Sequence, residues 1–337
     1  MNNGNNSSKP LIIDTDCSLG IKGRDVDDGL AVVFAINSTE LDIKGITKVY
    51  GNASLEKVSE SLANLLDVYE KSHNTKIAFP RVKGSDQTLH KMDATFNSYF
   101  LCDCFENEKQ SDFFYEHSIT RKIREGELYP AVKFMADMIK EYPNDIIIAP
   151  IGPLTNIALL LKVFPEVSED ISKFSVMGGK LGGYEFNFVN DPVATNVVLK
   201  SSVPTQVAGI EICTAQMITQ EHLDKVSEHN TILSSYLVDN CRPWLKLNRL
   251  SHLYRKNTGF YPFDLCAIIN LVDEEIISYE EITVRQTIPT INWSAFNMFC
   301  KTLKVDEKRT DQKDKAVEWG TNINSDEFLE IVVQRLN

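Results

Sequence analysis

Short apolar runs alternate along this chain with longer stretches in which apolar residues recur every three or four positions. The runs predict buried strands at 11–13, 41–47, 77–79, 145–150, 174–177 and 205–210. The longer stretches predict amphipathic helices at 30–36, 54–69, 131–142, 220–228 and 232–247, with a last helix from Ser325. Strands that alternate with helices in this way are typical of an α/β fold with an open sheet.

Residues 89–128 break this pattern, because they carry many aromatic and charged residues without a clear period. A structureless loop of that length is uncommon inside a compact domain. Two interpretations follow: two short helices that pack their aromatic rings inward, or a lid or insertion over a binding pocket.

The composition narrows the class of protein. The chain has 337 residues, 43% of them hydrophobic and 24% charged, which is typical of a globular protein and allows one large domain or two ordinary ones. A net charge of −12 argues against a nucleic-acid partner, since phosphate binding needs basic residues.

The first residues of the chain and its cysteines indicate where in the cell the protein is expected. Residues 1–9 are rich in Asn and Ser and predict a disordered tail rather than a signal peptide, and no apolar run approaches the length of about 20 residues that spans a membrane. An odd number of cysteines, seven, without a secretory signal predicts reduced thiols and a cytoplasmic protein that does not bind membranes.

Carboxylates gather where the first predicted strand ends. Asp14 and Asp16 end the strand, and Asp25, Asp27 and Asp28 precede the first helix. Ligands bind at the carboxyl ends of the strands of an open α/β sheet, and oxygen ligands favour Ca²⁺ or Mg²⁺. The same residues could instead form a solvated acidic loop that caps the helix, where carboxylates are favoured by the helix dipole.

The acidic segment, Asp-Thr-Asp followed by Asp-Val-Asp-Asp-Gly-Leu-Ala, resembles the N-terminal signature of the inosine–uridine-preferring nucleoside hydrolase family. The loop between its halves, Cys17–Arg24, is longer than in the family. Three further segments resemble the family in the same order: Gly-Pro-Leu-Thr-Asn-Ile-Ala from Gly152, Glu-Phe-Asn from Glu185 and the helix start at Asp264. Together they cover about residues 11–290.

The resemblance implies a mostly parallel, doubly wound sheet flanked by helices in a single large domain, spanning 10–337. It also implies a Ca²⁺-activated water that hydrolyses the N-glycosidic bond of ribonucleosides, and a homodimer or homotetramer. By resemblance, each site residue has a role: metal ligands Asp16, Asp28, Asp264 and the Ile151 carbonyl; general base Asp16, braced by Asp14; ribose contacts Asp27, Asn52, Glu185 and Asn187.

The leaving base is the open point of this assignment. Some family members have a histidine directly before the helix-opening Asp, where it protonates the base, and this chain has Phe263 there. A pseudoenzyme of the same fold that binds a nucleoside or sugar is therefore an alternative. A metal-dependent phosphatase is another, although the Glu-Phe-Asn and Gly-Pro-Leu-Thr-Asn segments argue against it.

Overall fold

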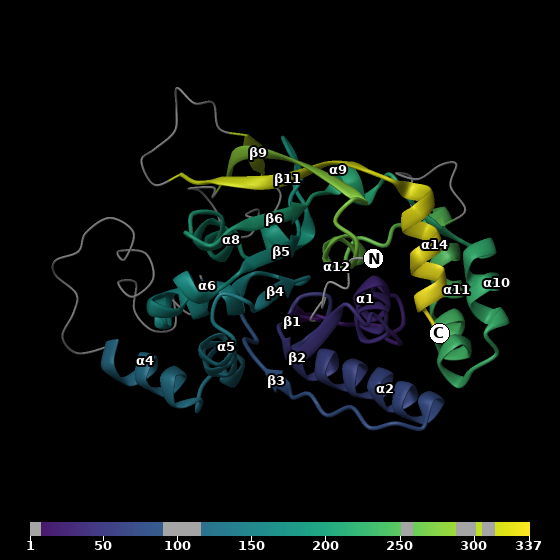
Figure 1. The fold of residues 1–337 in the computed structure, drawn as a ribbon, viewed down its shortest axis with the longest axis horizontal. Coiled ribbons are helices and arrows are strands. Elements are labelled where there is room, and N and C mark those ends of the chain that lie inside the picture. The colour runs from purple at the N-terminus through teal and green to yellow at the C-terminus, as the bar shows by residue number, and fades with distance from the viewer. Residues whose placement is uncertain (1–7, 90–115, 251–258, 288–300, 305–313) are drawn as a thin grey trace, which may run out of the picture.

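A nine-stranded sheet in the order β10-β9-β11-β6-β5-β4-β1-β2-β3 runs through the middle of the molecule (Figure 1). The structure, a computed structural model, describes residues 8–89, 116–250, 259–287, 301–304 and 314–337. The strands are β1 (Lys9–Thr15), β2 (Leu41–Lys48), β3 (Arg81–Lys83), β4 (Ile147–Pro150), β5 (Lys173–Met177), β6 (Thr205–Ala208), β9 (Ile277–Gln286), β10 (Thr302–Lys304) and β11 (Ala316–Ile323). The sheet is parallel from β11 to β3, while β9 and β10 pair antiparallel at its end.

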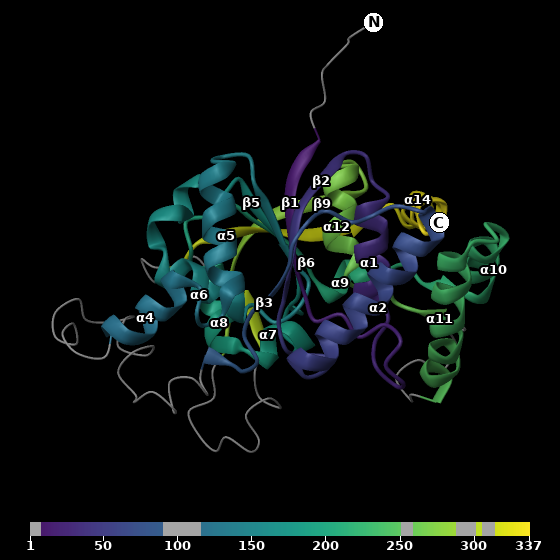
Figure 2. The same ribbon diagram turned by 90° about the horizontal axis from the view of Figure 1, so that it is seen from below.

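Helices cover both faces of this sheet, in agreement with the predicted doubly wound fold (Figure 2). One face carries α1 (Asp27–Ile36), α2 (Leu55–His73), α10 (Gln220–Glu228), α11 (Ile232–Leu250), α12 (Leu265–Val272) and α14 (Ser325–Arg335). The other face carries α4 (Glu116–Glu125), α5 (Pro130–Glu141), α6 (Thr155–Val163) and α8 (Pro192–Leu199). Shorter elements are α7 (Phe186–Asn190), α9 (Ile210–Cys213), a 3₁₀ helix (Pro165–Asp170) and a separate ribbon of β7 (Ile218–Thr219) with β8 (Gly259–Phe260).

The first strand shows why a run without alternation predicts a buried strand. Leu11 and Ile13 belong to the hydrophobic core on one face of the sheet, and Ile12 belongs to the core on the other. All three side chains are fully buried. Because successive side chains of a strand point to opposite faces, a strand covered on both faces must be apolar at every position.

Two predicted elements differ from the structure at the ends of strands. The prediction of a strand at 77–79 is wrong, because the edge strand of the sheet is β3. Ile77 and Phe79 pack against the hydrophobic core but belong to no strand. Hydrogen bonding to β2 decides which residues form the edge strand. The Pro80 carbonyl accepts from Ile46 N–H at 2.9 Å, and β3 continues this pairing from Arg81. At the start of the chain, Lys9 of the predicted tail is the first residue of β1 and pairs with Leu41 of β2.

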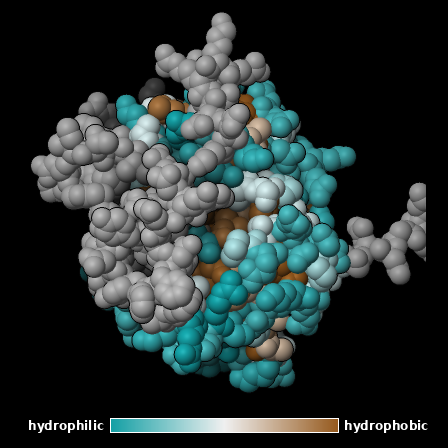
Figure 3. Space-filling view, turned by 90° about the vertical axis from the view of Figure 1, so that its left-hand side faces the viewer, coloured by the Kyte–Doolittle hydropathy of each residue, from teal (hydrophilic) through white to brown (hydrophobic). Residues whose placement is uncertain are grey.

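The predicted insertion at 89–128 is only partly covered by the described residues. α4 agrees with one short helix in that region, while residues 90–115, with most of the aromatic side chains, lie outside the described residues. The described helices include none long and apolar enough to cross a membrane. On the face seen in Figure 3, the described surface is mostly hydrophilic, with hydrophobic residues in a hollow near its centre and in smaller patches at its margins.

Candidate active site

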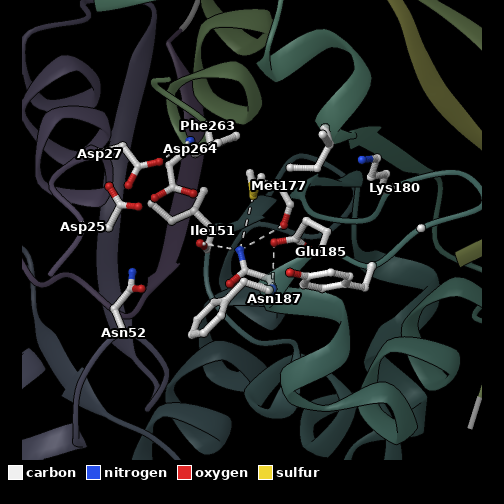
Figure 4. A pocket seen from close by; sticks show the side chains of 14 residues that line it. Asp25, Asp27, Asn52, Ile151, Met177, Lys180, Glu185, Asn187, Phe263 and Asp264 are labelled. Atoms are coloured by element: carbon white, nitrogen blue, oxygen red, sulfur yellow. Dashed lines mark hydrogen bonds between the residues drawn. The ribbon is translucent and has the colours of Figure 1, made fainter. Parts of the chain in front are cut away.

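A pocket of about 480 Å³ lies at the carboxyl ends of the central strands. Asp27 from the start of α1, Ile151 after β4 and Asp264 before α12 line it, together with Glu185 and Asn187 at the start of α7 (Figure 4). The parallel strands thus bring side chains that are up to 237 positions apart in sequence to one edge of the sheet.

The long loop Cys17–Arg24 folds the two halves of the acidic signature onto one place. Leu19 packs against Gly29, where an added Cβ would lie only 2.6 Å from the leucine side chain. The Leu19 carbonyl accepts from Ser61 Oγ at 2.7 Å, and Ser18 Oγ donates to the Asp25 carbonyl at 2.8 Å. These contacts hold the loop in a turn that brings the Asp16 and Asp28 carboxyl groups into contact with each other.

The carboxylates of Asp27, Asp28 and Asp264 form the centre of the site. All three are buried, and each offers an oxygen within 4.8 Å of the others. Asp28 is held by Thr15 Oγ1 at 2.5 Å and by Asn52 Nδ2 at 2.9 Å. The predicted metal ligands Asp28 and Asp264 therefore come together, and Asp27, predicted as a ribose contact, lies beside them.

Backbone groups of neighbouring loops hold the Asp16 carboxylate in place. Its Oδ2 accepts the Asn52 N–H at 2.5 Å, while its Oδ1 is buried without a hydrogen-bond partner among the described residues. Two glycines leave room for it: an added Cβ would lie 2.0 Å from Asp16 Oδ2 at Gly51 and 2.9 Å from Oδ1 at Gly152. No side chain fits at either glycine without moving this carboxylate.

Burial and crowding raise the pKa values of these acids. Loss of hydration raises the pKa of Asp14 and of Asp28 to about 6. The pKa values of Asp16, Asp27 and Asp264 are raised well above the usual range, first by burial and then by repulsion from neighbouring carboxylates. Such a cluster needs protons or a cation to neutralise it.

The donor set fits a hard divalent cation. The clustered ligand atoms are carboxylate oxygens, which suit Ca²⁺ or Mg²⁺ rather than a soft metal. Asp16, whose carboxyl group contacts that of Asp28, has a buried oxygen without a partner among the described residues and could hold the same cation. The Ile151 carbonyl, also a predicted ligand, accepts from Asn187 Nδ2 at 3.0 Å and keeps a second lone pair.

The remaining predicted residues shape the site in different ways. Both carboxylate oxygens of Glu185 accept backbone N–H groups: Oε1 from Asn187, and Oε2 from Gly179 and Phe188. Glu185 therefore builds the turn into α7 as well as facing the pocket. Asp14 Oδ1 accepts from Thr47 Oγ1 and Asn156 Nδ2, so these hydrogen bonds connect Asp14 to β2 and α6 rather than to Asp16.

Several pocket residues were missed by the sequence analysis. Lys180, Tyr184 and Phe186 line the pocket beside Glu185, and Met177 and Ile210 complete the apolar part around Phe263. Asp25 also reaches the pocket, although it was only counted among the acidic run. Phe186 belongs to the Glu-Phe-Asn segment and could have been found from it, whereas Lys180 and Tyr184 lie in the irregular stretch before that segment, where no pattern marks them.

Comparisons with known proteins agree with this geometry. Non-specific ribonucleoside hydrolase RihC of Escherichia coli is 29% identical over 278 residues, covering 80% of this chain and 81% of that protein. The Salmonella paratyphi B RihC is 29% identical over 289 residues, covering 82% and 83%.

Solved structures share the fold. The plant nucleoside hydrolase PpNRh1 superposes with a TM-score of 0.74 at 20% identity, covering 98% of this chain and 99% of that one. A purine-preferring ribonucleoside hydrolase from Gardnerella vaginalis gives 0.71 at 22% identity, covering 97% and 98%. The model of the inosine-uridine preferring nucleoside hydrolase family matches residues 11–330, so the chain belongs to that family of enzymes, which confirms the predicted reaction class, hydrolysis of an N-glycosidic bond.

Proposed function

We propose that this chain hydrolyses ribonucleosides with a Ca²⁺ ion held by Asp28, Asp264, Asp16 and the Ile151 carbonyl. The observation that carries the proposal is the buried carboxylate cluster, which has oxygens within 4.8 Å of one another and raised pKa values. When bound, the cation would polarise a water molecule and lower its pKa. Asp27 lines the pocket while Asp28 lies fully buried behind it, which supports a ribose contact for the first and a metal ligand for the second.

Asp16 takes the proton of the attacking water in this proposal. The carboxylate is held by Asn52 N–H at one oxygen and has no described protein partner at the other, so that oxygen is available to accept. A general base must lie within hydrogen-bond reach of the water it activates. The Gly51 and Gly152 contacts keep Asp16 from turning away.

The sugar and the base take separate parts of the pocket. Hydrolysis of an N-glycosidic bond develops positive charge on the sugar, which the neighbouring carboxylates of Asp27 and Asp264 would stabilise. Asp27, Asn52, Asn187 and Glu185 would contact its hydroxyls. The base would pack against Phe263, since Met177 and Ile210 complete an apolar surface there and no histidine lines the described pocket.

Metal analysis and a base-release assay test this function together. Wild-type protein should release free base from inosine or uridine with calcium, and lose this activity with a chelator. Asp28→Ala should lose the bound ion, whereas Asp67→Ala, which removes an exposed carboxylate of α2, should keep both ion and activity. A wild type that binds ribose yet never releases base would favour the pseudoenzyme. Cytoplasmic location and a homodimer or homotetramer stay predictions.

A further inference from the structure

The pocket has two walls of opposite charge. Asp25, Asp27 and Asp264 form one wall, and Lys180 is the one cation among the described residues that line the pocket. Figure 4 shows the Lys180 ammonium on the side opposite the carboxylates, turned toward the space between them. An ammonium held at the far side of an acidic site is positioned to meet negative charge on a bound molecule.

Neighbouring carboxylates do not neutralise Lys180. The structure records no ion pair for it with any described residue, and two acids of the adjoining segments, Glu185 and Glu211, accept hydrogen bonds from other donors. Glu185 accepts three backbone N–H groups. Glu211 accepts from Leu181 N–H at 2.8 Å and from Trp319 Nε1 at 3.3 Å.

A glycine directs the lysine stem along the pocket edge. An added Cβ at Gly183 would lie 2.8 Å from Lys180 Cδ and 3.1 Å from its Cγ, so the aliphatic stem packs directly over this glycine. Gly183 itself lines the pocket. The segment between Gly179 and Glu185 thus places the ammonium at the mouth without blocking the cavity.

The chemistry of a ribosyl compound fixes which of its groups meets this lysine. Vicinal cis-hydroxyls chelate a hard cation and pair with carboxylates, so the 2′,3′-diol belongs at the acidic wall. The 5′ carbon lies on the face of the furanose ring opposite the 2′- and 3′-hydroxyls and therefore points to the Lys180 wall. A neutral 5′-hydroxyl would leave the ammonium without a charged partner, while a phosphate ester there would give it a charge-assisted contact.

We propose that Lys180 binds a phosphate on the 5′ carbon, and that the substrates of this chain include ribonucleoside 5′-monophosphates. This inference rests on the proposed function. Water adds its hydroxyl to C1′, the C1′–N bond breaks with its electron pair passing to the base, and the water proton ends on the base. The products are free base and ribose 5-phosphate, with no co-reactant besides water.

Steady-state kinetics with inosine and inosine 5′-monophosphate test the assignment. The wild type should show the larger kcat/KM for the monophosphate, with the preference reduced at high salt because the lysine is exposed. Lys180→Gln should lower kcat/KM for the monophosphate about 10-fold, mainly through KM, and leave inosine nearly unchanged. Lys180→Arg should keep the preference, and Lys57→Gln, an equal charge change on the exposed side of α2, should change neither substrate.

Two results would overturn the assignment. One is a wild type that turns over inosine at least as well as its monophosphate, and the other is a Lys180→Gln variant that loses both substrates equally. If neither substrate releases base, the proposed hydrolysis fails, and calorimetry with ribose and ribose 5-phosphate decides the lysine separately. Equal affinity for the two sugars would then end the role of Lys180, and tighter binding of the phosphate that Lys180→Gln abolishes would support it.

Discussion

The two walls of the pocket are built in different ways. On the acidic wall, Asp27 and the carboxylates buried behind it, Asp16 and Asp28, are almost fully buried, and each accepts at least one hydrogen bond from the protein. On the opposite wall, Tyr184 is 65% exposed and Phe186 is 48% exposed. The first wall is fixed before any ligand arrives, whereas the second can change its side chains at little cost to the fold.

This difference suggests a division of labour. Groups that take part in bond breaking must be held in place, because a small displacement costs orders of magnitude in rate. Groups that select among substrates need only reach the ligand, and they lie where substitution is tolerated. We therefore expect changes in the acidic wall to affect the rate for every substrate, and changes in the opposite wall to affect the choice of substrate.

Asp16→Asn should have the largest effect. The amide keeps an oxygen for a cation but cannot accept a proton at neutral pH, so kcat should fall about 10²-fold to 10⁴-fold. A calcium titration should not restore the rate. Full recovery at saturating calcium would show that Asp16 acts as a metal ligand alone and would end its role as general base.

A pair of glycine substitutions compares the two walls directly. Gly51→Ala places a Cβ 2.0 Å from Asp16 Oδ2, and the resulting shift of this carboxylate should lower kcat about 100-fold. Gly182→Ala meets no atom within 4 Å but forces alanine to a φ of +71°, which should cost about 1 kcal/mol of unfolding free energy and change kcat by less than about 2-fold. Similar kinetic losses in both variants would contradict the division between the walls.

Much of the acidic wall was predictable from the sequence because its residues lie at the ends of strands and starts of helices. The run at 11–13, followed by Asp14 and Asp16, predicts a strand and a site at its carboxyl end, as observed. The Glu185 side chain illustrates the limit of this reasoning. Its backbone hydrogen bonds depend on how the segment from Gly179 folds, which no periodicity reveals.

The opposite wall was hardly predictable for the same reason. Lys180 and Tyr184 lie in a short irregular segment between β5 and α7. The pattern of apolar residues there does not indicate which side chains point into the pocket. The edge strand β3 shows the same effect in the fold, since hydrogen bonding to β2 rather than hydrophobicity decides its position. Loops and edges are determined by tertiary contacts that the sequence shows only indirectly.

Discrimination against 2′-deoxyribonucleosides should come from the acidic wall alone. Removing the 2′-hydroxyl leaves a buried carboxylate such as Asp27 without its partner, at a cost of about 1–3 kcal/mol, or roughly 5-fold to 150-fold in kcat/KM. Lys180→Gln should leave this ratio as it is. Comparing inosine with 2′-deoxyinosine measures it in both proteins, and equal turnover of the two sugars would refute a ribose contact at this wall.

The smallest expected effect is a pH dependence of stability that comes from Asp14 and Asp28, which are buried behind the acidic wall. The pKa of Asp14 and Asp28 rises from 3.8 to about 6 on folding, so the folded state holds protons that the unfolded state releases. Without a cation, the contribution of these two groups to stability is therefore full below about pH 4, and it is lost as the pH rises from there through about 6. Calcium replaces the protons, so the gain in Tm on adding calcium should increase by several degrees between pH 5 and pH 7.

Thermal melts of chelated and calcium-loaded protein measure this gain, and Asp28→Asn should reduce it while Tyr184→Ala should not. A gain that is the same at both pH values would mean that the buried carboxylates do not control the stability of this wall.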